Sequence, residues 1–225
     1  MKALDRENCL EAVSSLDSSG DFKSAGGWVS GPRFDVIESI NPDYILTSDR
    51  LQRKIRDSLE DKGYEVCHFE PETLEEVYKS IREIGKLLET EDKAEEIVSE
   101  MREELSSIDL GGARVYCEEW SDPAMISGNW IPFLVREIGG EYPIQKGRSR
   151  EIDMTNLADF NPEYIMINTC GNREVDKTKI TNREKLKNTV AVRKDNVFRL
   201  NDSLLNRPSP KLVQGGKEIE KRVLE

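Results

Sequence analysis

The chain has 225 residues, with 33 basic and 44 acidic side chains and a net charge of −11. This excess of acid repels phosphate groups, which argues against nucleic acid or an anionic membrane as the main partner. The four cysteines are widely spaced and there is a single histidine, so neither a disulfide scaffold nor a histidine-rich metal site is expected. We therefore predict no metal site and no resident cofactor.

The first part of the chain alternates helices and strands after an irregular start. Residues 1–32 are rich in serine and glycine, and the stretch 24–32 is predicted to be a loop. Gly63 fits the end of a helix. The expected elements are a helix over 33–40, a strand over 43–48, a helix over 51–62 and a strand over 64–69.

The middle of the chain is predicted to be helical. Apolar residues recur at helical spacing from Leu74 to Leu88, and Thr73 with Glu76 has the pattern of a capping box in front of them. A second periodic stretch begins at the acidic residues 91–92 and runs for about 18 residues, or roughly 27 Å. We expect this second helix to carry the chain from one lobe to another.

The last part of the chain again alternates strands and helices, which predicts mainly parallel sheets. Ser209 is predicted as the N-cap of the closing helix, with Pro210 at its first position. The expected elements are strands over 114–118, 164–169 and 196–200 and helices over 132–138, 155–160 and 182–187.

One phrase occurs twice, as I-N-P-D-Y-I-L over residues 40–46 and as F-N-P-E-Y-I-M over residues 160–166. The copies lie 120 positions apart (161 minus 41), and each leads into a short apolar strand. This predicts an α/β fold of two lobes with mainly parallel sheets, a long connecting helix and a ligand cleft between the lobes. The expected boundaries are 1–89, 90–108 for the helix, and 109–225.

Three segments have the composition of a binding site. Residues 117–132 leave the carboxyl end of a strand, where ligands collect in open α/β sheets. Residues 168–172 follow the repeated strand, and residues 206–211 open the last helix. We expect these three segments to contribute to one site.

All three tryptophans, Trp28, Trp120 and Trp130, fall in predicted loops. Indoles supply large apolar faces with one polar group, so together they suit a broad apolar ligand. The alternative for each is that it caps the core of its lobe. Arg207 has two interpretations as well: it pairs with a ligand carboxylate or phosphate, or it ties the last helix to the lobe through an ion pair.

The sequence carries no catalytic signature. Gly111-Gly112 precedes a strand, whereas a phosphate-binding loop follows one, and there is no G-x-S-x-G motif. Glu118 and Glu119 are neighbours, so in a strand they point to opposite faces and cannot act as an acid/base pair. We expect a binding protein and not an enzyme.

Several short motifs follow one another in a fixed order. They are Glu119-Trp120-Ser121-Asp122-Pro123, Gly128-Asn129-Trp130-Ile131-Pro132, Ile138-Gly139-Gly140, Asn161-Pro162-Glu163, Cys170-Gly171, Ala191-Val192-Arg193 and Arg207-Pro208-Ser209-Pro210-Lys211. With these motifs the chain resembles, from about residue 33 to its end, the class III substrate-binding proteins of ABC importers. The resemblance is to the cobalamin and ferric-siderophore branch, and most closely to its cobalamin-binding members.

The resemblance implies that the protein captures a corrinoid, such as cobalamin or cobinamide, or a ferric siderophore, and delivers it to an ABC permease. It also implies two α/β lobes joined by one long helix. The residues expected to frame the ligand are Trp28, Trp120 and Trp130, and those expected to supply polar contacts are Ser48, Asp49, Glu119, Cys170, Asn172 and Arg207.

Three departures from the family pattern leave alternatives open. The strand and helix that usually open such proteins are not found, so we expect an incomplete N-terminal lobe whose open sheet edge could pair in a homodimer. No secretory signal is found, which favours a cytoplasmic location where the resemblance implies an extracytoplasmic one. Asn206 stands where relatives carry a permease-docking glutamate. The alternatives are an intracellular corrinoid-binding or sensing protein and a truncated paralogue that does not transport.

Overall fold

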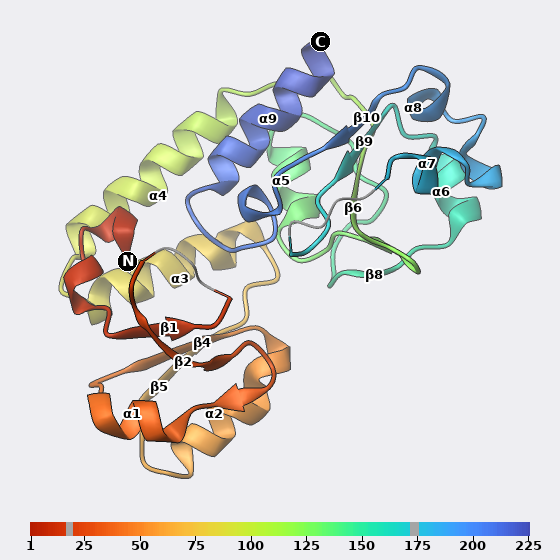
Figure 1. Cartoon of the computed structure of the whole chain (residues 1–225). Coiled ribbons are helices and arrows are strands. Elements are labelled where there is room, and N and C mark those ends of the chain that lie inside the picture. Colours follow the sequence, from red (N-terminus) through yellow and green to blue (C-terminus); the bar gives the residue numbers. More distant parts are fainter. Residues whose placement is uncertain (17–19, 172–175) are drawn as a thin grey trace. The chain divides into compact units, whose positions relative to one another are not determined.

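A computed structural model describes residues 1–16, 20–171 and 176–225. Its contacts divide the chain into two compact units, Met1–Glu70 and Pro71–Glu225, here called the N-terminal unit and the C-terminal unit. Figure 1 shows the elements of both. Each unit is described by itself.

The N-terminal unit holds two small sheets. In one, β1 pairs in parallel with β2, and β2 pairs antiparallel with β3; in the other, β4 pairs in parallel with β5. The elements of this unit are 3-10 helices η1 (Lys2–Leu4), η2 (Glu7–Cys9) and η3 (Arg50–Gln52), strands β1 (Ala12–Ser14), β2 (Lys23–Gly27), β3 (Gly31–Pro32), β4 (Ile45–Ser48) and β5 (Val66–Phe69), and helices α1 (Phe34–Ile40) and α2 (Arg53–Glu60).

The loop predicted over residues 24–32 is wrong, because most of it is strand. Glycines that indicated a loop instead allow two backbones to meet in the β2–β3 pair. Gly26 has φ +136°, and a Cβ there would lie 2.4 Å from the carbonyl oxygen of Gly31. A side chain at this position would therefore separate the two strands.

The C-terminal unit is built on one sheet of five strands in the order β10-β9-β6-β7-β8. Strands β10, β9 and β6 run parallel, whereas β7 and β8 are antiparallel additions. Its elements are helices α3 (Leu74–Leu87), α4 (Glu91–Ser106), α5 (Ile131–Glu137), α6 (Met154–Phe160), α7 (Thr178–Thr181), α8 (Val190–Arg193) and α9 (Leu212–Leu224), 3-10 helices η4 (Glu184–Leu186) and η5 (Asp202–Leu204), and strands β6 (Val115–Ser121), β7 (Ala124–Ile126), β8 (Arg150–Glu151), β9 (Tyr164–Ile167) and β10 (Val197–Arg199).

Three local predictions in the C-terminal unit need correction. Strand β6 continues to Ser121 and turns back as β7, so part of the predicted 117–132 loop is a hairpin. The helix predicted over 182–187 is only the 3-10 turn η4, preceded by α7. Helix α9 starts at Leu212 with no side-chain cap, because Ser209 lies in an irregular turn whose carbonyl accepts from Leu212 N–H.

The repeated phrase has the same local structure in both units. Asn41 ends α1 and Asn161 ends α6, each in the left-handed conformation with φ 51° and 52°. Asparagine tolerates this conformation, and the proline that follows cannot continue the helix. The chain then enters β4 in one unit and β9 in the other. The predicted α/β fold is confirmed, and four of the seven strand pairings described are parallel.

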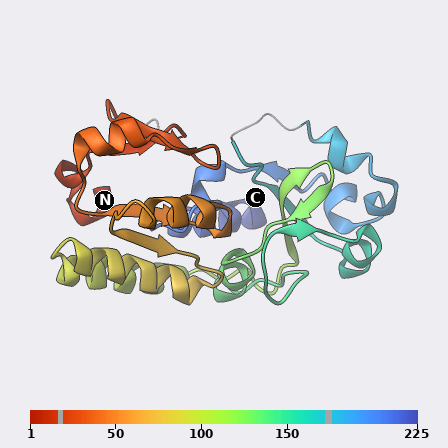
Figure 2. The ribbon, with the colours of Figure 1, turned by 90° about the horizontal axis from the view of Figure 1, so that it is seen from below.

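Helices α3 and α4 are adjacent in the C-terminal unit (Figures 1 and 2). The predicted capping box is present, with Glu76 N–H donating to Thr73 Oγ1 at 3.1 Å and Thr73 N–H donating to Glu76 Oε2 at 3.0 Å. The contacts group both helices with the residues that follow them. The predicted lobe boundaries and the connecting role of residues 90–108 stay predictions.

The buried apolar residues are distributed unevenly. Among the described residues of the N-terminal unit, only Leu4, Ile37 and Leu59 are buried hydrophobic residues, whereas the C-terminal unit has a large core. That core includes fully buried side chains on β6, β9, α4, α5 and α9. No helix in the part of the chain that the structure describes is both long enough and apolar enough to cross a bilayer.

Candidate functional site

In the C-terminal unit, polar side chains gather where the parallel strands β6 and β9 end. Cys117 of β6 lies opposite Met166 of β9, and Glu118 lies opposite Ile167, the last residue of β9, so Glu119 lies in β6 just beyond the end of this pairing. Residues that follow adjacent parallel strands lie at one edge of the sheet, which is where α/β proteins bind ligands. The candidate residues Glu119 and Cys170 are both at this edge.

Glu118 is a buried structural carboxylate. Its side chain is 0% exposed and forms an ion pair with Arg183, whose Nη2 donates to Glu118 Oε1 at 3.0 Å. The Tyr116 hydroxyl donates to Glu118 Oε2 at 2.9 Å, and Arg183 Nη2 also donates to the Ser121 carbonyl at 2.7 Å. This network holds the end of β6 and leaves Glu119 on the opposite face.

Glu119 binds two side chains from other segments. Its Oε2 accepts a hydrogen bond from Ser149, and its Oε1 accepts one from the Cys170 thiol at 3.5 Å. Ser149 Oγ also accepts from the Gly128 N–H at 3.0 Å. Glu119 therefore joins strand β6, the loop before β8 and the end of β9 at one half-buried carboxylate.

Asn206 continues this cluster toward the core. Its Nδ2 donates to Cys170 Sγ at 3.1 Å and to the Asn168 carbonyl at 2.7 Å. Asn168 Nδ2 in turn donates to Asn206 Oδ1 at 2.6 Å and to Ser127 Oγ at 3.0 Å. We call Glu119, Ser149, Cys170, Asn168 and Asn206 the Glu119 cluster.

Cys170 is a hydrogen-bonding thiol in this cluster and not a thiolate. Burial, together with the nearby charge of Glu119, raises its pKa to about 12. At neutral pH the thiol is therefore protonated, consistent with its donation to Glu119. Across residues 1–16, 20–171 and 176–225, no three histidine, cysteine or carboxylate side chains are grouped as metal ligands.

The tryptophans of the C-terminal unit have different environments. Trp130 is 7% exposed at the start of α5, and its Nε1–H donates to the Leu205 carbonyl at 2.8 Å. This placement favours the alternative that Trp130 caps the core. Trp120 lies in β6 next to Glu119, is half-buried, and donates from Nε1 to the Asp122 carbonyl at 2.9 Å.

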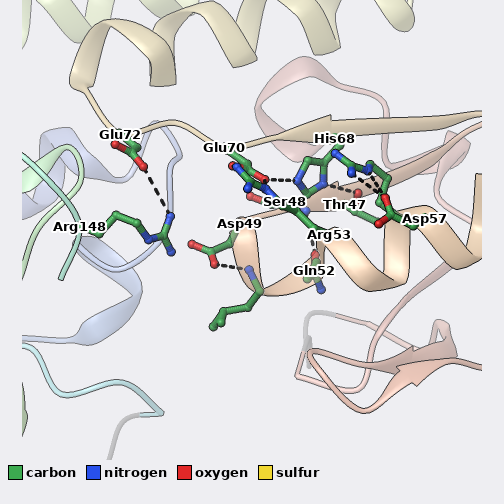
Figure 3. A network of polar contacts seen from close by, with 12 residues as sticks. Thr47, Ser48, Asp49, Gln52, Arg53, Asp57, His68, Glu70, Glu72 and Arg148 are labelled. Atoms are coloured by element: carbon green, nitrogen blue, oxygen red, sulfur yellow. Dashed lines mark hydrogen bonds and ion pairs between the residues drawn. The ribbon is translucent and has the colours of Figure 1, made fainter. Parts of the chain in front are cut away.

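The remaining candidates of this unit lie beside the cluster or outside the described residues. Arg207 is exposed and directly follows Asn206. Asn172 lies outside the residues that the structure describes. Arg148, next to Ser149, pairs with Glu72 at 3.9 Å (Figure 3).

In the N-terminal unit, Gln52 joins two of the predicted residues. Its Nε2 donates to the Trp28 carbonyl at 2.9 Å, and its Oε1 accepts from Ser48 N–H at 2.8 Å. Asp49 follows β4 with φ +71°, and its carboxylate caps the next turn by accepting from Leu51 N–H at 2.9 Å. Trp28, Ser48 and Asp49 are therefore held together at the carboxyl end of β4.

The single histidine lies in a second network at this end of the small sheet (Figure 3). His68 Nδ1 is 2.7 Å from Thr47 Oγ1, and its Nε2 is 2.7 Å from Glu70 Oε1. Arg53 also binds Glu70 through two hydrogen bonds. The bond from Arg53 is the main cause that lowers the Glu70 pKa to about 2. His68 is engaged with protein groups on both ring nitrogens.

Sequence reasoning missed Gln52, Ser149, Asn168 and Asp202. Asp202 accepts from the Gly171 N–H at 2.9 Å and so fixes the turn after Cys170. Asn168 was inside a segment identified by its composition, whereas Ser149 sits in an unremarkable polar loop. Gln52 also had a local signal, as a polar residue one turn beyond a strand end.

The profile of the periplasmic binding protein family matches residues 27–204. This match spans most of the chain, and the chain belongs to the periplasmic binding protein family. A sequence search among curated proteins gives no match.

Solved structures of this fold resemble the chain over nearly its whole length. A possible iron-binding (periplasmic solute-binding) protein from Staphylococcus epidermidis has a TM-score of 0.82 at 18% identity, with 100% of this chain and 93% of that chain covered. The periplasmic heme-binding protein HutB of Vibrio cholerae has a TM-score of 0.82 at 16% identity, with 100% and 94% covered. The periplasmic vitamin B12-binding protein BtuF of Vibrio cholerae has a TM-score of 0.67 at 15% identity, with 91% and 82% covered. At these identities the likeness supports the fold, and the predicted resemblance to substrate-binding proteins is confirmed at the level of the family.

Proposed function

We propose that the protein binds a corrinoid, with a ferric chelate as the second choice, and delivers it to an ABC permease from an extracytoplasmic location. The observation that carries this proposal is the Glu119 cluster at the carboxyl ends of β6 and β9. Membership of the periplasmic binding protein family supports a binding role.

The polarity of the cluster supports a ligand that donates hydrogen bonds. Glu119 is an acceptor, and its neighbours Ser149, Cys170 and Asn206 are uncharged. A ligand rich in carboxylates would be repelled by the Glu119 carboxylate and by the net charge of −11 on the protein. A periphery of amide groups, as on a corrinoid, offers N–H donors to Glu119 and to the exposed part of the cluster.

Apolar contact would come from the indoles near the strand ends. Trp120 follows Glu119 on β6, and Trp28 is held at the carboxyl end of β4 by Gln52. Both are half-buried, so part of each ring is available to a ligand. Arg207 supplies a cation for a phosphate or carboxylate group on the same ligand.

An intracellular binding or sensing role without a permease is the alternative. It is favoured by Asn206, whose side chain is occupied by Asn168 and Cys170 and carries no charge for docking a permease. The two roles share the same ligand site and differ only in the partner.

The test is isothermal titration of the full chain with cyanocobalamin, with dicyanocobinamide and with a ferric hydroxamate siderophore. We expect saturable corrinoid binding, and Glu119→Gln should weaken it about 10-fold to 100-fold, because a hydrogen bond to a charged group contributes about 1.5–3 kcal/mol. Glu103→Gln, on the exposed side of α4, is the matched control and should leave the affinity unchanged. Absence of saturable binding with all three ligands would overturn the proposal, and wild-type affinity in Glu119→Gln would remove Glu119 from the site.

A further inference from the structure

Helices α3, α4 and α5 of the C-terminal unit (Figure 1) line a groove of about 400 Å³ that shares no residue with the Glu119 cluster. Small-molecule pockets in proteins measure about 300–1,000 Å³, so the groove has room for a small ligand. Its charged side chains are Glu75, Arg102, Arg136 and Glu137. What these side chains bind within the protein decides which of them are available to a ligand.

Tyr78 also lines the groove, with a hydroxyl that binds no described residue. Its side chain is only 2% exposed. The hydroxyls of the other tyrosines in this unit donate to protein groups, and these tyrosines are Tyr116, Tyr142 and Tyr164. A buried tyrosine hydroxyl usually has a hydrogen-bond partner, so the Tyr78 hydroxyl indicates a site for a ligand.

The charged groups of the groove act on this hydroxyl. Burial is the main cause that raises the pKa of Tyr78 to about 12, and the charges of Arg102, Glu137 and Glu75 also act on it. The hydroxyl is therefore protonated at neutral pH and can donate a hydrogen bond beside these groups. The Arg102 guanidinium lies 4.6 Å from the centre of the Tyr78 ring and forms an ion pair with Glu75. Since Arg102 and Glu75 bind each other, the charges left for a ligand are those of Arg136 and Glu137.

Two N–H groups of Arg136 have no acceptor among the described residues. A guanidinium has five N–H donors in a planar fork. Three of them donate here to backbone carbonyls, those of Pro132, Ile144 and Gln145. This leaves the Nε–H and one N–H of Nη2, and Arg82 uses the same two nitrogens to bind both oxygens of Glu95. The free donors of Arg136 therefore suit a ligand carboxylate.

Glu137 supplies a negative charge next to Arg136. Its carboxylate is exposed and has no ion-pair partner in the part of the chain that the structure describes. Glu137 is the last residue of α5, where the negative end of the helix dipole favours a cation nearby. The rest of the lining is apolar and consists of Leu74, Phe133 and the ring of Tyr78. The groove thus offers an anion site, a cation site and an apolar wall.

We propose that the groove binds a free amino acid with an apolar side chain. Arg136 and the Tyr78 hydroxyl bind its carboxylate, and Glu137 binds its ammonium group. Leu74 and Phe133 contact its side chain. An amino acid carries no net charge and so matches a groove whose two arginines and two glutamates cancel. A ligand with a carboxylate alone would be repelled by Glu137, and a ligand with an amine alone would be repelled by Arg136.

The test is isothermal titration of the full chain with L-phenylalanine, and with phenylacetate and phenethylamine as analogues that each lack one of its charged groups. We expect saturable binding of L-phenylalanine. It should bind at least about tenfold more tightly than either analogue, because each analogue leaves one charged group of the groove without its partner.

Two substitutions locate the ligand in the groove. Glu137→Gln should weaken L-phenylalanine binding about tenfold or more and should not weaken phenylacetate binding, because only the amino acid carries the ammonium group. Tyr78→Phe should weaken the binding of both about fivefold, since both carry a carboxylate. It should leave the midpoint of urea denaturation unchanged, because no described residue binds the hydroxyl. The control is Glu103→Gln, which removes a charge on α4 next to Arg102 but outside the groove, and it should leave the affinity unchanged.

The absence of saturable L-phenylalanine binding would overturn the proposal. So would phenylacetate that binds as tightly as L-phenylalanine, or wild-type affinity in Glu137→Gln or in Tyr78→Phe. The corrinoid titration is a separate measurement on residues outside this groove, so the failure of one proposal is distinguishable from the failure of the other.

Discussion

The buried ion pair between Arg183 and Glu118 allows a quantitative prediction. Glu118 is 0% exposed and the Arg183 side chain is 15% exposed, so the pair is almost completely removed from water. Replacing Arg183 by Met removes two hydrogen bonds to the carboxylate and one to the Ser121 carbonyl, and leaves Glu118 with the Tyr116 hydroxyl. Removing one partner of a buried ion pair costs about 3–5 kcal/mol.

The measurement is the free energy of unfolding from urea denaturation at neutral pH, followed by tryptophan fluorescence. A loss of 3–5 kcal/mol corresponds to a fall in melting temperature of roughly 6–20 °C for a unit of this size. The control is Arg82→Met, because Arg82 pairs with Glu95 at 2.6 Å through two bonds on the surface, where such a pair contributes about 0–1 kcal/mol.

A double variant tests the stated cause. In Glu118→Gln with Arg183→Met the buried charge is gone, so the double variant should be more stable than Arg183→Met alone by about 1 kcal/mol or more. If Arg183→Met costs no more than Arg82→Met, or if the double variant is less stable than the single, then the burial of an unpaired carboxylate is not the reason for the loss.

Three further outcomes are expected from other parts of the chain. Gly85→Ala should lower the free energy of unfolding by about 1–3 kcal/mol although alanine favours helices, because the new Cβ on α3 would lie 2.3 Å from Ala94 Cβ on α4. Adding Ala94→Gly to this variant should restore stability in urea denaturation. A gain in stability from Gly85→Ala alone would refute the contact. The pKa of Glu70 is lowered from 4.5 to about 2, chiefly by Arg53, so the contribution of Glu70 to stability is complete above pH 4.5 and is lost as the pH falls toward 2. Arg53→Met should therefore make stability depend less on pH in this range of the acid-unfolding curve. An unchanged curve would contradict the assignment. Burial raises the pKa of Cys170 to about 12, so iodoacetamide at pH 8 should alkylate this thiol far more slowly in the folded chain than in the urea-unfolded chain. Peptide mass spectrometry would measure the two rates. Equal rates would show that the thiol is not held in the cluster.

Local patterns predicted most of the regular elements. The spacing of apolar residues located α3 and α4, and the Thr73–Glu76 pattern located the start of α3. The repeated Asn-Pro phrase located both left-handed helix ends, because asparagine tolerates that conformation and proline stops the helix. These features depend on residues a few positions apart, which the sequence alone contains.

Contacts between distant residues were not predictable in this way. Strand β2 was missed because its glycines signal a loop locally, whereas their function is the close approach of Gly31 to Gly26. Trp130 was placed in a loop by its neighbours, but the carbonyl of Leu205, 75 positions away, holds it in the core.

In the candidate site too, the sequence predicted local features and the tertiary structure decided the contacts between distant residues. The sequence predicted that Glu119 and Cys170 follow strands, because strand ends are local features; Cys170 does follow β9, whereas Glu119 lies inside β6, which continues to Ser121. Only the tertiary structure decided that β6 and β9 are adjacent and parallel, which brings the Cys170 thiol within 3.5 Å of Glu119 Oε1. The tertiary structure also brought Ser149, Asn168 and Gln52 into the site. Their hydrogen-bond partners lie at least 20 positions away in the sequence, apart from Ser48, which binds Gln52. Strand pairing and side-chain hydrogen bonds across the fold depend on how the chain packs, and packing is what a one-dimensional pattern does not contain.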